Sequence, residues 1–423
     1  MPNIPEHLPP KLTICYWGWD WITFGTPGEP WDDVDRAVRE TKERGYNCIR
    51  AEIGPDWMYT QDLKPRGPLE FVTSVRGGLK NCHCINEKGG GRHDVYQRVI
   101  QLFESAAKHG MFIIPTTWEY QDANNHLGDP DLKREINAIV KEKRMINLAI
   151  KDNHFLCDLK RRGLSKRIAY FEIYNEINYD YADFPKPRTK AMVEDALGYL
   201  RMRHPDILMS ADYATFDPEV FADNSQLVDH HKYTSFIMSE IFAQAGVWQN
   251  NFPDFANNDF LKWLLKDNCE EWNYFKTRAS SLREFWWPIM YFYENLDNEK
   301  YDYCCYKMFG DRIDKIIEEL KSPLEAAADF ARKRKLPVVI DEGYLFYPPY
   351  YSRFEQSAAG RHISEAVCDI CIENDYWGFY TSGYTRPNTV AWHDDDHCCK
   401  IKKINEKFLA SANKARLPES YAY

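Results

Sequence analysis

Long apolar runs are missing from this sequence of 423 residues. A membrane-spanning helix needs about 18 or more consecutive apolar residues, and no such stretch occurs. The opening "MPNIPEHLPPKLTICYW" also lacks the basic segment and long apolar segment of a secretory signal. We therefore expect no membrane partner and predict a cytoplasmic location.

An excess of positive charge is missing as well. The chain has 54 Lys and Arg against 64 Asp and Glu, a formal net charge of −10. Nucleic-acid-binding proteins usually present basic patches to the phosphate backbone. The charge balance therefore argues against a nucleic acid as partner, and it leaves homo-oligomerisation open.

The 12 cysteines do not form the spaced pairs that hold structural zinc. Most stand in apolar surroundings, which predicts reduced thiols in a cytoplasm. Two short clusters, "CHC" (82–84) and "HDDDHCC" (393–399), contain metal-ligand types without the usual spacing. We interpret them as solvated loops, with a structural metal as the alternative. "GGG" (89–91) lacks the Lys-Ser/Thr of a phosphate-binding loop, so we interpret it as a flexible loop and expect no cofactor.

What the sequence does contain is a regular alternation of strand-like and helical segments. Strands that alternate with helices indicate βα units and parallel pairing, and eight units predict an α/β fold, a single (β/α)8 TIM barrel. The eight predicted strands cover residues 11–19, 46–53, 111–118, 167–175, 207–213, 226–233, 336–344 and 376–384.

One segment, 236–310, does not follow the alternation. It is rich in aromatic residues ("FWWPIMYFYENL") and separates the sixth strand from its helix. We predict an insertion on the face where the strands end. Because we see neither linker composition nor internal repeats, we predict that residues 1–423 form a single (β/α)8 catalytic domain.

Polar side chains stand at the predicted carboxyl ends of the strands, where the active sites of such barrels lie. The fourth strand ends in Asn175-Glu176 and the seventh in Asp341-Glu342. Either glutamate alone would suggest a salt-bridged strand end. Together they suggest glycoside hydrolysis, in which one carboxyl protonates the leaving oxygen and the other attacks the anomeric carbon or activates a water.

Four short motifs then resemble those of clan A glycoside hydrolases, the cellulase-like TIM-barrel group that includes mannanases and β-galactosidases. "YFEIYNEI" (170–177) resembles the fourth-strand Asn-Glu motif, and "PVVIDEG" (337–343) is similar to the nucleophile segment on the seventh strand. "YNCIRAEI" (46–53) resembles the second strand and "HHKY" (230–233) the sixth-strand His-x-Tyr. The resemblance extends over about 12–400, through these motifs only.

The resemblance implies a retaining β-glycosidase and assigns roles to single residues. Glu176 would be the general acid/base and Glu342 the nucleophile. Asn175 would hold the sugar 2-hydroxyl, while Arg50 and Tyr233 would bind the carboxylate of Glu342. His231 begins the His-x-Tyr motif and is a further candidate for binding the substrate. Independently of the family, a nucleophilic carboxyl needs a low pKa, which a neighbouring Arg provides, and an acid needs a raised one.

The chain departs from the family pattern on two strands. The eighth strand reads "GFYTSGYTRP" where a Trp usually forms the sugar platform, so Tyr380, Tyr384 or Trp392 would have to replace it. The third strand, "TTWEYQDA", matches no expected residues. By residue type, further candidates for binding sugar are Trp118 and Trp19 for stacking and Asp20, Glu119 and Gln121 for hydroxyl groups.

Several alternatives remain at this level. Trp17, Trp19 and Trp21 alternate, so we expect them on one face, either stacked on sugar rings or packed in the core. Arg386 and Lys232 could face the pocket and bind an acidic glycan. The aromatic insertion suggests a covered pocket and exo-action on short chains. The competing functions are a non-catalytic carbohydrate-binding barrel and a metal-dependent hydrolase, although the first strand has no His.

Overall fold

The structure of the protein is a computed structural model of residues 1–423. The structure describes residues 4–71, 90–118, 127–247, 255–278, 287–345, 349, 351–382 and 385–414. Within these parts of the chain, we find no helix with the length and apolar character that crossing a membrane requires.

The predicted eight-strand pattern is confirmed. Seven parallel strands follow the order β5-β2-β1-β11-β10-β9-β8, and β6 pairs in parallel with β7. β7 and β8 lie on either side of Ala211 and form one interrupted strand, while a parallel bridge joins Ile113 to Ile168 just before β6. These links close the strands into a (β/α)8 barrel. The bounds are β1 Leu12–Trp17, β2 Cys48–Glu52, β5 Phe112–Thr116, β6 Phe171–Glu172, β7 Met209–Ser210, β8 Asp212–Tyr213, β9 Val228–Thr234, β10 Val338–Leu345 and β11 Gly378–Tyr380.

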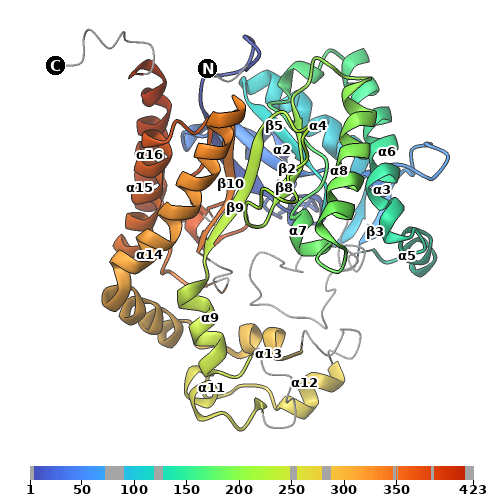
Figure 1. Cartoon of the computed structure of the whole chain (residues 1–423). Coiled ribbons are helices and arrows are strands. Elements are labelled where there is room, and N and C mark those ends of the chain that lie inside the picture. The colour runs from blue at the N-terminus through green and yellow to red at the C-terminus, as the bar shows by residue number, and fades with distance from the viewer. Residues whose placement is uncertain are drawn as a thin grey trace.

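Long helices surround the barrel (Figure 1). Their ends follow local rules: the Asp33 and Asp94 side chains accept hydrogen bonds from the first turns of α2 and α4, and Gly110 in left-handed conformation ends α4. The bounds are α2 Val34–Glu43, α4 Val95–His109, α5 Pro130–Asn137, α6 Lys141–Arg161, α8 Lys186–Arg201, α14 Asn298–Arg334, α15 Ala358–Glu373 and α16 Asp395–Lys414. Short helices are α1 Asp20–Thr23, α3 Pro55–Met58 and α7 Ile177–Asp180.

Two predicted loops have regular structure. Gly91 lies in β4 (Gly91–His93), which pairs antiparallel with β3 (Leu69–Phe71); Gly89 lies outside the described residues. "HDDDHCC" (393–399) enters α16 instead of forming a solvated loop. His397 is buried there, with Nε2 2.8 Å from the Thr385 hydroxyl. "CHC" (82–84) lies outside the described residues.

The alternation of Trp17, Trp19 and Trp21 does not place them on one face. The strand ends at Trp17 and helix α1 begins at Asp20, so the two-residue period of the strand stops between them. Trp17 and Trp21 are fully buried, with ring centroids 6.1 Å apart. Trp19 turns instead toward Trp118, at a ring distance of 5.3 Å.

A group of helices lies on the side of the barrel where β9 ends (Figure 1). It comprises α9 Ser235–Gln244, α11 Asp259–Leu264, α12 Trp272–Arg278 and α13 Trp287–Asn295, between β9 and α14. Its aromatic residues pack on one another: Trp272 lies 5.0 Å from Phe255 and 5.1 Å from Tyr291 between ring centroids. Much of the aromatic excess therefore forms a small core. The insertion bounds 236–310 and the single catalytic domain stay predictions.

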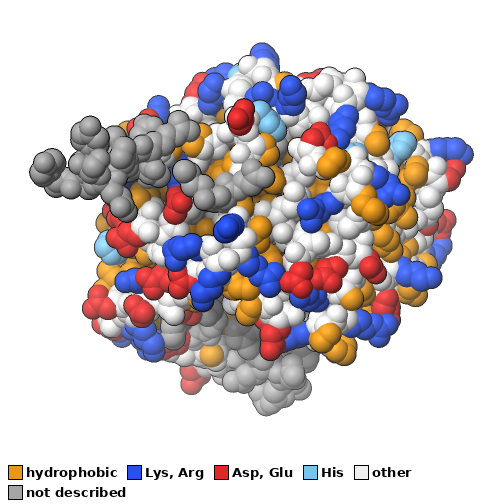
Figure 2. All heavy atoms as spheres, turned by 45° about the horizontal axis from the view of Figure 1, so that its top comes forward, with side chains coloured by type: hydrophobic (Ala, Val, Ile, Leu, Met, Phe, Trp, Pro, Cys, Tyr) orange, Lys and Arg blue, Asp and Glu red, His pale blue; other side chains and the backbone are white. Residues whose placement is uncertain are grey.

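Charged residues occur both on the surface of the protein and in a buried layer inside the barrel. Figure 2, in which the top of Figure 1 is tilted forward, shows basic and acidic side chains interspersed over the visible face. Surface ion pairs such as Lys190–Asp223 (2.8 Å) contribute about 0–1 kcal/mol each. Inside the barrel, an apolar layer that includes Ile14, Cys48 and Val339 lies beneath a layer of fully buried charged residues. That charged layer supports the candidate site.

The close approach of β10 to β9 requires glycine at position 343. A Cβ on Gly343, at φ 153°, would lie 2.4 Å from the Lys232 carbonyl oxygen on β9. We expect Gly343→Ala to lower the free energy of unfolding by about 3 kcal/mol, since the strands must separate. Gly310→Ala, within α14, is the control, because nothing lies within 4 Å of its Cβ position and its backbone is not in the left-handed region. Equal loss in both variants, measured by urea denaturation, would contradict this expectation.

Candidate active site

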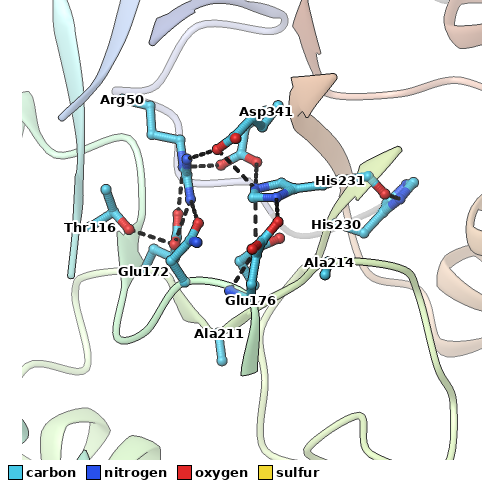
Figure 3. Close-up of polar contacts among 12 residues, drawn as sticks. Arg50, Thr116, Glu172, Glu176, Ala211, Ala214, His230, His231 and Asp341 are labelled. Atoms are coloured by element: carbon cyan, nitrogen blue, oxygen red, sulfur yellow. Dashed lines mark hydrogen bonds and ion pairs between the residues drawn. The ribbon is translucent and has the colours of Figure 1, made fainter. Parts of the chain in front are cut away.

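Arg50, on β2, is the centre of a buried ion-pair network at the carboxyl ends of the strands (Figure 3). Its Nη1 donates to Glu342 Oε2 and its Nε to Glu172 Oε2, each at 2.8 Å. The Nε atom also lies 2.8 Å from Asp341 Oδ2, and Nη2 donates to the Asn175 amide oxygen. Arg50 therefore joins β2 to the fourth- and seventh-strand motifs.

A bulge in β10 explains why two consecutive carboxylates, Asp341 and Glu342, both face the interior. Ile340 on β10 pairs with His230 on β9. From this pair to the next, β10 advances by two residues, to Glu342, whereas β9 advances by only one, to His231. The extra residue breaks the alternation of faces. Asp341 accordingly contacts Arg50 and accepts from the Tyr170 hydroxyl at 3.0 Å, while Glu342 accepts from the Tyr233 hydroxyl.

Glu176 follows β6 with left-handed backbone angles, φ 46° and ψ 51°. Such angles are uncommon for residues other than glycine and need support from surrounding contacts. The Glu176 N–H donates to Asp212 Oδ2 at 2.9 Å, and its Oε1 lies 3.0 Å from His231 Nδ1. The left-handed turn thus aims a charged side chain out of the end of a buried strand.

Glu176 and Glu342 differ from the other carboxyls of the network in one respect. Their side chains are 14% and 10% exposed, whereas those of Glu172, Asp212 and Asp341 are 0% exposed. Glu176, His231 and Glu342 each place one polar atom within 4.8 Å of those of the other two. These two glutamates therefore reach the surface of the network side by side.

Burial and charge together set the protonation of the network. Burial raises the pKa of Asp212 well above the usual range, although the charge of His231 opposes the shift, and burial with neighbouring carboxylates raises that of Asp229. Burial acts in the same direction on Asp341, but Arg50 and His231 outweigh it and hold its pKa below the ordinary value. Burial would lower the pKa of His231, but Asp212 and Glu342 raise it well above the ordinary value. Arg50, His231 and Asp341 thus favour their charged forms, whereas ionisation of Asp212 is opposed by its burial and favoured by its pairing with His231.

An aromatic wall lies beside these charges. Trp118, at the end of β5, meets Tyr16 edge-on at 5.0 Å and lies 5.0 Å from the Arg50 guanidinium. Tyr380 and the half-buried Trp19 complete the cluster. Of the stacking candidates proposed from residue type, Trp118 and Trp19 are therefore near the network.

Other predicted residues lie elsewhere. Trp392 is on the outside of the barrel, where its ring packs 3.8 Å from the Arg44 guanidinium and its indole N–H donates to Glu40. Asp20 is 2% exposed; Arg386 lies 2.9 Å away and the Asn388 side chain donates to it, with the Arg386 guanidinium 5.1 Å from the Tyr16 ring. Lys232 extends toward Glu319, 3.8 Å away. Glu119, Gln121 and Tyr384 lie outside the described residues.

Sequence reasoning missed the supporting carboxyls Glu172, Asp212 and Asp229. Each is an acidic residue inside an apolar strand, in "FEI", "SADY" and "LVDHH". Asp229 also stands two residues before His231, which puts both on the same strand face. Buried acidic residues at such positions were the available signal.

In the described regions, three groups of side chains place atoms that could bind a metal within 4.8 Å of one another. They are Glu176–His231–Glu342, Asp212–His231–Asp341 and Glu172–Asp229–Asp341. His231 belongs to two of them, and both of its ring nitrogens already lie 3.0–3.2 Å from carboxylate oxygens. In the third, Glu172 and Asp341 bind Arg50. Arg50 and His231 therefore lie beside carboxylates of all three groups, while His231 Nε2 and both Asp229 carboxyl oxygens make no hydrogen bond with another described residue.

No protein-family model and no curated protein sequence matches the chain. Among solved structures, a protein provisionally assigned as a glycoside hydrolase from Parabacteroides distasonis aligns with a TM-score of 0.68 at 16% identity, over 96% of this chain and 99% of that one. A glycoside hydrolase family 5 mannosidase from Rhizomucor miehei aligns with a TM-score of 0.51 at 12% identity, over 96% of this chain and 95% of that one. An endo-1,4-β-D-mannanase from Thermotoga petrophila aligns with a TM-score of 0.50 at 10% identity, over 94% of this chain and 99% of that one. At such identities the likeness establishes the fold alone: the chain has the same (β/α)8 fold as these proteins.

Proposed function

We propose that the protein is a retaining glycoside hydrolase that cleaves a β-linked glycoside or short oligosaccharide by double displacement. The observation that carries the proposal is the pair Glu176 and Glu342, the partly exposed carboxyls above a buried ionic network. Their oxygens lie within 4.8 Å. Retaining enzymes separate their two carboxyls by about 5 Å, whereas inverting enzymes need about 6.5–9.5 Å to admit a water.

The contacts divide the two roles. Glu342 accepts from Arg50 and Tyr233, donors that stabilise a carboxylate, so we assign it as the nucleophile. Glu176 would protonate the leaving oxygen while Glu342 attacks the anomeric carbon. Glu176, now a carboxylate, would then take a proton from the water that releases the sugar from Glu342. Asn175, beside Arg50, is our candidate for the 2-hydroxyl contact.

The substrate class follows from weaker observations. Two of the compared structures are named for mannoside or mannan hydrolysis, so β-mannosides are the first glycosides to test. Helices α9 and α11–α13 lie on the side where β9 ends, and we propose that they cover the pocket and favour exo-action on short chains. With Lys232 and Arg386 engaged by Glu319 and Asp20, a neutral sugar is the better candidate.

The proposal is tested with a panel of 4-nitrophenyl β- and α-glycosides, with the product followed by proton NMR during the first minutes. We expect one β-glycoside to be cleaved and the β-anomer of the sugar to appear first. First release of the α-anomer would contradict the retaining mechanism. Sugar binding without any hydrolysis would favour a carbohydrate-binding barrel instead.

Trp118 and Trp392 are expected to differ in their effects on that reaction. Trp118→Ala removes a ring beside Arg50, so we expect KM to rise about tenfold, the loss of about 1.4 kcal/mol of stacking. Trp392→Ala should leave KM unchanged and lower the melting temperature, since its ring packs on Arg44. Steady-state kinetics and thermal unfolding of both variants make the comparison, and a raised KM in Trp392→Ala would contradict it.

A further inference from the structure

Asp212 contacts both the backbone of Glu176 and the ring of His231. The Asp212 side chain, on β8, is 0% exposed. Its Oδ2 accepts from the Glu176 N–H at 2.9 Å and lies 3.1 Å from His231 Nε2. We propose that Asp212 is a positioning residue that holds His231 in its charged form and fixes Glu176 for proton transfer. The second part rests on the function proposed above.

The geometry around His231 favours the doubly protonated ring. Nδ1 lies 3.0 Å from Glu176 Oε1, and Nε2 lies 3.1 Å from Asp212 Oδ2. A nearby carboxylate stabilises the protonated form of a ring nitrogen. His231 Nδ1 makes a hydrogen bond with Glu176, and the charges of Asp212 and Asp341 act on Nε2 without a hydrogen bond. The remaining charged groups that face the ring come from β10: Asp341 Oδ1 at 3.2 Å and Glu342 Oε2 at 3.7 Å, with Arg50 beyond them.

Asp212 is better suited to this role than Asp341. Asp341 forms an ion pair with Arg50 at 2.8 Å and accepts a hydrogen bond from the Tyr170 hydroxyl at 3.0 Å. The contacts of the Asp212 carboxylate described above go instead to His231 and Glu176. It is thus the carboxylate that couples the ring to the candidate acid.

Asp212 also supports the strained turn at Glu176. The left-handed conformation of Glu176 needs an external contact, and the Asp212 side chain provides one at the Glu176 N–H. The backbone N–H of Asp212 donates to the Tyr174 carbonyl at 3.0 Å, so β8 holds the same turn from two points. A shift of Asp212 would therefore move Glu176 relative to Glu342.

The charge of His231 can be measured without any substrate. In the wild type we expect the ring nitrogens, followed by two-dimensional 15N–1H NMR, to remain doubly protonated between about pH 5 and 8. Asp212→Asn removes the negative charge but keeps an acceptor for the Glu176 N–H, so His231 should titrate within that range. A wild-type ring that is neutral at pH 7, or a ring unaffected by Asp212→Asn, would overturn the proposal.

The effect on Glu176 is measured by the dependence on the leaving group. Departure of 2,4-dinitrophenol needs no proton, whereas departure of methanol or a sugar does. We expect Asp212→Asn to lower kcat/KM for a methyl glycoside or disaccharide about tenfold, and Asp212→Ala, which also removes the backbone contact, about a hundredfold. For the dinitrophenyl glycoside of the same sugar, we expect changes below about threefold.

Controls separate this role from a merely structural one. Asp229→Asn makes the same substitution at another fully buried carboxyl, on β9, and should affect both substrates by the same factor. If neither Asp212 variant folds, His231→Gln should show the same split between substrates. Equal losses on both substrates in the Asp212 and His231 variants would overturn the proposal. If the wild type cleaves no glycoside, the proposed function fails, and the NMR titration still decides whether Asp212 holds His231 charged.

Discussion

Glu342→Gln is expected to lower kcat about 10⁵-fold on every substrate of the protein, because the substitution removes the attacking carboxylate while keeping the shape of the side chain. Unlike loss of a general acid, this loss cannot be reduced by a better leaving group. The fold should persist, since the amide oxygen can still accept from Arg50 while the amide N–H donates to the Tyr233 hydroxyl oxygen.

The measurement compares Glu342→Gln with Glu355→Gln, which changes a buried glutamate that accepts from Ser382. The control should retain wild-type kcat. A 2-deoxy-2-fluoro-β-glycoside, which slows release of the covalent intermediate, should add one sugar mass to wild-type Glu342, as located by peptide mass spectrometry. Labelling of another residue, or more than about 1% residual activity in Glu342→Gln, would contradict the assignment.

Arg50→Met is expected to lower the free energy of unfolding by about 4 kcal/mol at pH 7. The substitution leaves Glu172 and Asp341 without their guanidinium partner while both remain 0% exposed, and breaking a buried pair in this way typically costs about 3–5 kcal/mol. Urea denaturation followed by tryptophan fluorescence measures the difference. Arg312→Met, which breaks a partly exposed pair with Glu240, should lower the free energy of unfolding far less, because solvent screens such a pair.

The same variant should respond differently to pH. Burial opposes ionisation of Asp341, but Arg50 and His231 prevail and hold its folded-state pKa below the ordinary value. That carboxylate therefore stabilises the wild type above its unfolded-state pKa, and the contribution is lost as pH falls through the folded-state value. Arg50→Met has less of this contribution to lose, so the difference in stability should shrink below about pH 4. A difference that is independent of pH would show that Arg50 acts through packing alone.

Some features of the site were readable in the sequence because they are local. The alternation of strands and helices predicts the barrel, and the barrel then requires Asn175-Glu176 and Asp341-Glu342 to meet at one end. The place of Arg50 followed from the same strand order. The place of Trp392 did not follow from the strand order, because the segment after the eighth strand could run either over the barrel end or along its outside. Its contact with Arg44 is long-range, and no local pattern encodes it.

The sequence by itself determined the order of the elements and the chemical types at the strand ends, because hydrophobic period and strand polarity are properties of neighbouring residues. Only the tertiary structure decided which charges share a partner. The bulge that turns both Asp341 and Glu342 inward depends on the pairing of β10 with β9. The contact of Asp212 with His231 and Glu176 depends on β8 lying between their strands. Electrostatic interactions depend on distance in space, and residues far apart in the chain are brought within about 3 Å only when the barrel closes.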